Sequence, residues 1–257
     1  MMQSDINKRR AVRQKKARRR RLKTAFIFFL IIALITLAIM CFTVFFPIKR
    51  INVSGSEIYS KSEIIKASKL TTDDNLLVVS EEEIENNIRQ KLPYVDSVKL
   101  KRVLPDAVIL TVSDAKEYAY YQSGESYFIL SENGYILKEQ TEIPENVFQI
   151  ITSGINGEVS SKATYVNNAE EELVNTLIST LQNKEINIDE IDVSNVLEIS
   201  LEVEGRFTVL LGTTDYTEEK IAHLKGMIDS IPDRKGKINL SMWTPTNSQG
   251  SFTEEDN

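Results

Sequence analysis

The sequence has few of the residues that build disulfide, metal and catalytic sites. Its 257 residues include one Cys, one His and one Trp, with 10 Gly and 6 Pro. A single cysteine excludes an internal disulfide framework, and a single histidine excludes His-rich metal sites and the HExxH motif. The P-loop, G-x-G-x-x-G and G-x-S-x-G motifs are also absent. With 42% hydrophobic and 26% charged residues, the chain has the composition of a folded protein of one or two domains.

The candidates for catalysis that remain are weak. Ser113 and Lys116 match the S-x-x-K spacing of penicillin-binding proteins, but the companion S-x-N and K-T-G elements are missing. The glutamate runs at 81–83 and 170–172 fall where helices are predicted to begin, and the helix dipole favours acidic residues there. His223 has no second His or Cys with which to share a metal. We therefore predict no enzyme, no catalytic residue, no cofactor and no metal.

One long apolar run interrupts the chain. Residues 24–46 contain no charged residue, Gly or Pro. A helix of 23 residues is roughly 35 Å long, enough to cross a hydrocarbon core of about 30 Å. The run is longer than the apolar region of a secretory signal, and Met40-Cys41-Phe42 offers no small-residue cleavage site. The sequence therefore predicts an uncleaved transmembrane helix over 24–46.

Charge is distributed very unevenly around this run. Residues 1–23 carry eleven Lys/Arg and one Asp, whereas residues 24–257 carry twenty basic and thirty-six acidic residues, so +10 is followed by −16. The positive-inside rule places the N-terminus in the cytoplasm and the rest outside. A basic run can also bind nucleic acid, but its position beside an apolar span favours a role in topology and contact with lipid head groups. The residues expected to set topology are Arg18, Arg19, Arg20, Arg21 and Lys23.

Residues 48–115 predict a compact α+β unit of order β-α-α-β-β. Ser60 with Glu63 and Ser80 with Glu83 have the spacing of capping boxes at two helix starts. Ile84, Ile88 and Leu92 recur every four residues and should form one buried stripe on the second helix. Alternating apolar residues predict strands before the first helix and after the second. Two helices covering one face of a three-stranded sheet are the expected packing.

A second mixed α/β domain is predicted over 116–243, followed by a disordered acidic tail over 244–257. Asn168 with Glu171 should cap a helix bearing Leu173, Leu177 and Leu181, and another helix should start near Thr217. Tyr118, Tyr120 and Tyr121 cluster just past the first domain. They are candidate interface anchors, and the alternative is that Tyr118 and Tyr120 continue the strand alternation into the core. Polar and acidic residues dominate the tail, which is typical of disorder.

The order of these patterns resembles a known family. The segments I-N-V-S-G, S-K-S-E-I-I and L-P-Y-V-D-S-V-K-L-K-R-V-L-P-D-A-V-I-L-T-V resemble a POTRA domain. Placed directly after one N-terminal span, they resemble the FtsQ/DivIB family of bacterial division proteins, and the likeness continues over roughly 24–243. This resemblance implies a single-pass membrane protein at the division septum. It would be a non-catalytic scaffold of the divisome, with FtsB/DivIC and FtsL as partners and neither nucleic acid nor a small-molecule substrate.

The last predicted strand is the expected partner site. A terminal strand often lies at a sheet edge, where its free amides and carbonyls can pair with a partner strand. In the family that the chain resembles, the corresponding strand receives FtsB/DivIC. The residues expected there are Ile238, Asn239, Leu240, Ser241, Met242 and Trp243.

A second hypothesis is an extracytoplasmic sensor or receptor anchored by one span. That hypothesis requires a cytoplasmic output module, and 23 residues are too few to fold into one.

Overall fold

The computed structural model describes residues 23, 26–37, 46–247 and 250–255. Residues 26–37 are helical and exposed throughout. The remaining positions of the predicted span, 24–25 and 38–45, lie outside the described residues, as do Arg18, Arg19, Arg20 and Arg21. Among the described helices, none has both the length and the apolar character needed to cross a membrane.

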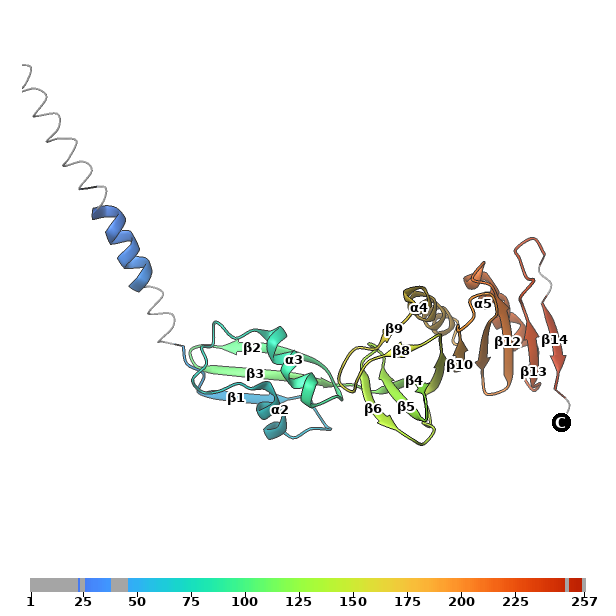
Figure 1. Ribbon diagram of the computed structural model, residues 1–257, viewed down its shortest axis with the longest axis horizontal. Helices are drawn as coiled ribbons and strands as arrows, with labels where there is room; N and C mark the ends of the chain where they lie inside the picture. The colour runs from blue at the N-terminus through green and yellow to red at the C-terminus, as the bar shows by residue number, and fades with distance from the viewer. Residues whose placement is uncertain (1–22, 24–25, 38–45, 248–249, 256–257) are drawn as a thin grey trace, which may run out of the picture.

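The first domain has the predicted β-α-α-β-β order (Figure 1). Its three strands lie in the order β1-β3-β2, with β1 parallel and β2 antiparallel to β3. Both helices pack on this sheet, and α2 also contacts α3. The elements are β1 (Arg50–Ser54), α2 (Lys61–Ser68), α3 (Glu81–Lys91), β2 (Val95–Val103) and β3 (Ala107–Asp114).

Local signals fix the helices of this domain. Ser60 and Glu63 form the predicted capping box at the start of α2. At α3 the Ser80 side chain accepts a hydrogen bond from the Glu83 amide, and the helix ends at Lys91, with Leu92 as its C-cap before Pro93. Ile84, Ile88 and Leu92 are buried in one cluster with residues from all three strands, so the predicted stripe is confirmed.

Gly55 directly follows β1, at a position that sterically admits only glycine. Its φ is 101°, and an added Cβ would lie 2.2 Å from the carbonyl oxygen of Val112 on β3. Only glycine satisfies both the positive φ and the close approach.

The second domain is built on a single sheet of nine strands. Its order is β14-β13-β12-β11-β10-β7-β4-β5-β6, and the small β8–β9 pair lies beside it. The strands that have not yet been given bounds are β4 (Glu117–Ser123), β5 (Ser126–Ser131), β6 (Ile136–Gln140), β7 (Phe148–Ile151), β8 (Ile155–Asn156), β9 (Thr164–Tyr165), β10 (Ile188–Asp192), β11 (Ile199–Val203), β12 (Phe207–Gly212), β13 (Gly236–Asn239) and β14 (Ser251–Glu254).

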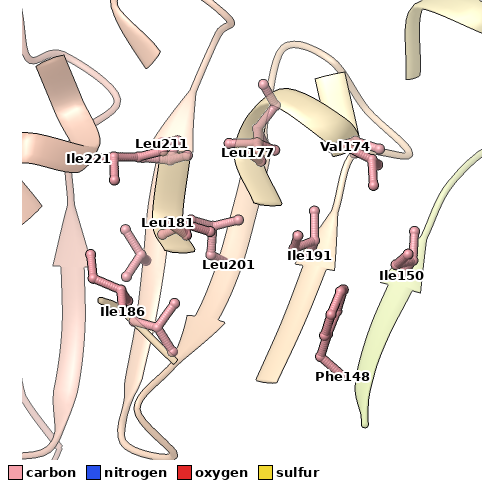
Figure 2. Close-up of a cluster of buried hydrophobic side chains, with 14 of the residues drawn as sticks. Phe148, Ile150, Val174, Leu177, Leu181, Ile186, Ile191, Leu201, Leu211 and Ile221 are labelled. Carbon is pink, nitrogen blue, oxygen red and sulfur yellow. The ribbon is translucent and has the colours of Figure 1, made fainter. Parts of the chain in front are cut away.

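Helices α4 (Asn168–Asn183) and α5 (Thr217–Ser230) close the core of this domain. Figure 2 shows Val174, Leu177 and Leu181 of α4 above apolar side chains of the sheet. The predicted cap of α4 is wrong by one residue: the capping side chain is Asn167, which accepts from the Ala169 amide. Asn168 is instead the first helical residue.

The tyrosine cluster belongs largely to this core. Tyr120 and Tyr121 are buried, and Tyr121 stacks on Phe128 at 5.1 Å. The Tyr118 ring is half-buried and meets Phe148 edge-on. Strand alternation predicts Tyr118 and Tyr120 on the core side. Tyr120 is buried and Tyr118 packs partly buried against the core cluster, but the tyrosine inside that cluster is Tyr121, which the alternation does not include.

Side-chain contacts join the two domains where β3 passes into β4. The Arg89 guanidinium lies 4.0 Å from the centre of the Tyr135 ring, a cation–π contact between α3 and the second domain. The Tyr94 hydroxyl donates to the Glu117 carboxylate at 2.6 Å. Burial, followed by this carboxylate, raises the pKa of Tyr94, so the hydroxyl keeps its proton and the hydrogen bond.

Candidate partner-binding surface

The end of the nine-stranded sheet differs from the expectation. The predicted edge strand is β13, which pairs in parallel with β12 on one side and antiparallel with β14 on the other. The expectation that Ile238–Trp243 is a free sheet edge is therefore wrong. The expectation of a disordered tail is wrong as well over Ser251–Glu254, because these residues form the outermost strand.

Close backbone approach positions β14. A Cβ at Gly236 would lie 2.2 Å from the Thr253 carbonyl oxygen, so a larger residue there would push β14 away. Phe252 packs on the core, with its ring centre 6.3 Å from that of Phe207 at an interplanar angle of 76°. The approach at Gly250, directly before β14, is less close: a Cβ there would lie 2.9 Å from a Leu240 methyl carbon.

Ion pairs at the surface add a smaller contribution. Glu254 lies 3.8 Å from Arg234, and Glu255 lies 3.2 Å from Lys235. All four side chains are more than half exposed, so each pair contributes about 0–1 kcal/mol.

The chain leaves the sheet after Asn239. The Asn239 Oδ1 accepts hydrogen bonds from the Ser241 amide at 2.9 Å and from its hydroxyl at 2.7 Å. The Trp243 amide donates to the Leu240 carbonyl at 3.1 Å. Ser241 and Met242 therefore lie in a turn and not in a strand, because the Asn239 side chain replaces the next ladder partner.

The side chains of this turn differ sharply in exposure. Met242 is 79% exposed. Trp243 is buried against α5, where its ring centre lies 5.7 Å from that of His223. Its Nε1 is a buried donor that has no hydrogen-bond partner within the described part of the chain. Trp243 and His223 thus anchor the turn, and Met242 is its protruding member.

Lys220 on α5 binds backbone carbonyls at the end of β12, near the same end of the sheet. Its side chain is buried, and Nζ donates to the carbonyls of Leu211 at 2.7 Å and Thr213 at 3.1 Å. Burial lowers the pKa of Lys220, and the nearby Asp215 carboxylate opposes this shift. The two carbonyl contacts identify Lys220 as a structural cap on the end of β12.

Hydrogen bonding defines which groups of β14 face outward. The amides of Gly236 and Leu240 donate towards β12, so by alternation Lys237 and Asn239 face β14. Lys237 is opposite Thr253, which consequently faces inward. The amides of Phe252 and Glu254 then point away from the sheet. The outer edge of β14 offers these groups to a partner strand.

The other sequence candidates do not meet at this surface. Glu170 is buried and accepts from the Ser153 amide at 2.9 Å, which fastens α4 to the end of β7. Ser113 lies within a β-strand, whereas the S-x-x-K nucleophile needs a helical setting. The described residues hold no group of three metal-ligating side chains. Lys23 is helical and exposed, far along the chain from these residues.

The missed strand had a weak signal in the sequence. Ser251-Phe252-Thr253 places an aromatic and a β-branched residue directly after Gly250. Four residues flanked by polar chain are too few for a periodic pattern, and acidic neighbours are typical of disordered segments.

The fold defines a class of protein: a two-domain protein in which a small α+β domain precedes a domain built on a long open sheet. Residues 46–114 match the family model described as "POTRA domain, FtsQ-type". The chain is 30% identical over 203 residues to Cell division protein DivIB of Clostridium acetobutylicum, covering 77% of this chain and 80% of the relative.

Two further relatives extend the match. DivIB of Bacillus subtilis is 24% identical over 240 residues, covering 93% of this chain and 87% of the relative. Cell division protein FtsQ of Streptomyces coelicolor is 23% identical over 212 residues, with 79% and 78% covered. The chain belongs to the DivIB/FtsQ family of cell division proteins, and the resemblance inferred from its sequence is confirmed.

Proposed function

We propose that this protein is a non-catalytic, single-span membrane scaffold of the division complex. Its N-terminus lies in the cytoplasm and both folded domains lie outside, at the division septum. Its partners are of the FtsB/DivIC and FtsL type, and it supports septal wall synthesis by holding them together. Family membership supports the division role.

The membrane anchor is supported by composition and exposure. Residues 26–37 are apolar apart from Thr36, and every one of them is exposed, so no described part of the protein covers this helix. Eleven basic residues precede the run and two, Lys49 and Arg50, follow it closely. This asymmetry is the positive-inside pattern of an N-terminus retained in the cytoplasm.

The observation that carries the scaffold proposal is the open end of the sheet. The outward amides of Phe252 and Glu254 allow a partner strand to add to β14 by main-chain hydrogen bonds. In this proposal Ile238–Trp243 form the end of β13, which pairs with β14, and the turn that follows it. Met242 in this turn is exposed to the partner. The residues that the sequence predicts to bind thus remain part of the proposed surface, but they lie on and after β13 and not on the outermost strand, β14.

Proline substitutions test this proposal. Glu254→Pro removes an outward amide and keeps the pairing with β13, whereas Thr253→Pro removes an inward one. Binding of the purified extracellular domain of an FtsB/DivIC-type partner is measured by biolayer interferometry, and thermal unfolding is measured on the same sample. Glu254→Pro should abolish binding with little change in melting temperature, and Glu254→Ala should bind like wild type because the contact is made by the backbone.

The Thr253→Pro variant is the matched control. It should release β14 and lower the melting temperature as well as binding. Wild-type binding by Glu254→Pro would refute addition at this edge. A fluorescent fusion tests the division role separately, because uniform membrane signal through the cell cycle would contradict a septal scaffold.

A further inference from the structure

Three exposed apolar side chains gather at one end of the first domain. Leu77 is 41% exposed, Val78 75% and Leu104 62%. Leu77 and Val78 lie between α2 and α3, and Leu104 lies in the β2–β3 turn. We name these three residues the apolar base. Burying these apolar side chains away from water would be favourable, yet no described part of the chain covers their exposed surface.

Hydrogen bonds hold the two loops of the apolar base together. Arg102 on β2 donates from Nε to the Leu76 carbonyl at 3.0 Å and from Nη2 to the Val79 carbonyl at 2.6 Å. Within the turn, the Leu77 amide donates to Asn75 Oδ1 at 2.8 Å, while Leu76 itself is fully buried. The exposure of Leu77 and Val78 is therefore imposed by an ordered turn.

The same loops are bonded to the chain where it enters the domain. The Leu76 amide donates to the Phe46 carbonyl at 2.8 Å, and the Ile48 amide donates to the Asp74 carbonyl at 2.9 Å. On the other loop, Asp106 accepts at its carbonyl from the Lys49 amide at 2.8 Å. Phe46 is the last residue of the apolar run, so the apolar base lies beside the point where a span would leave the bilayer.

The charge of the two domains favours the same orientation. Residues 46–114 carry ten basic and eleven acidic side chains, close to neutral, whereas residues 115–257 carry ten basic and twenty-five acidic ones. Lys49, whose amide donates to Asp106 in the loop that carries Leu104, has an exposed side chain. An anionic membrane surface repels the strongly acidic second domain and admits the near-neutral first one.

We infer that the apolar base inserts into the interfacial region of the bilayer and seats the first domain directly on the membrane. The occupant of this surface is the lipid head-group layer, because the apolar run ends one hydrogen bond from the turn that carries Leu77 and Val78. The inference rests on the proposed membrane span and adds a second attachment. With two attachments the first domain has a fixed face towards the membrane instead of swinging about a single linker.

The test uses the full chain reconstituted into phosphatidylcholine–phosphatidylglycerol vesicles. In a Cys41→Ser background, an environment-sensitive fluorophore is attached at Val78→Cys, Leu104→Cys or Ile143→Cys. Ile143 is the matched control, since it is apolar and 65% exposed but lies in the second domain. Brominated lipids should quench the labels at 78 and 104 and shift their emission to the blue, and the label at 143 should show neither change.

Flotation of the vesicles after carbonate extraction separates the two proposals. Carbonate-resistant flotation with no quenching at 78 and 104 overturns the membrane seat and leaves the span intact. Loss of flotation overturns the span and the seat with it. Equal quenching at all three positions also overturns the inference, because it would mean general collapse of the protein onto lipid.

Discussion

Ile88 offers a direct test of how the first domain is held together. Its side chain is fully buried between α3 and the sheet. Ile88→Ala removes three carbon groups, which at ~0.8 kcal/mol each amounts to about 2.4 kcal/mol of lost transfer free energy. The cavity left behind adds to this, for a total cost of about 2–5 kcal/mol. In a domain of this size the melting temperature should fall by roughly 10 °C or more.

The position of the only tryptophan makes the assay selective. Trp243 lies in the second domain, so its fluorescence follows unfolding there, whereas far-UV circular dichroism follows both domains. Ile88→Ala should shift an early dichroism transition and leave the tryptophan transition in place. Asn86→Ala is the matched control, because Asn86 lies on the exposed face of the same helix and should change stability by less than about 0.5 kcal/mol. Unchanged dichroism would refute the assigned core face, and a joint shift of both signals would refute independent unfolding of the two domains.

Three further predictions concern topology, backbone strain and pH. A reporter fused after Asn257 should be active only outside the cytoplasm, and neutralising the seven basic residues from Lys15 to Lys23 should reduce correct insertion; unchanged orientation would exclude control by these charges. Gly55→Ala should destabilise the first domain in chemical denaturation, because its Cβ would collide with the Val112 carbonyl, and wild-type stability would contradict the close approach. Burial raises the pKa of Tyr121 to about 12, so its contribution to stability is complete below pH 10 and is lost as pH rises from 10 to 12. The tryptophan-monitored melting temperature should therefore fall less over that range in Tyr121→Phe than in wild type, and equal slopes would refute this role.

The parts of the fold that could be predicted depend on short-range signals. Ser60 with Glu63 bonds within its own helix turn, and the stripe through Ile88 repeats at a period set by the helix itself. Such patterns need no knowledge of the rest of the molecule. The predicted cap of α4 is off by one residue because Asn167 and Asn168 have the same side chain, and only the backbone conformation decides which of them caps the helix.

The candidate site was harder to predict because its geometry is tertiary. No sequence pattern near Gly236 predicts that Thr253 lies against it. The Asn239 side chain ends β13 by accepting a hydrogen bond from the Ser241 amide, and the alternation of apolar residues does not predict such a bond. The free edge therefore lies one strand further along the chain than the sequence pattern predicts.

The open sheet also has a mechanical consequence. Nine strands in one unbroken order make eight steps of about 4.8 Å, so β14 is held roughly 38 Å from β6. Figure 1 shows β14 at the end of the molecule opposite the first domain. A flexible tether would give a partner a broad range of heights above its attachment point, whereas a hydrogen-bonded sheet gives one. The number of strands therefore sets the distance between the two edges of the sheet. Inserting or deleting a strand within the sheet would shift the outer edge by one strand spacing without changing the groups that β14 exposes.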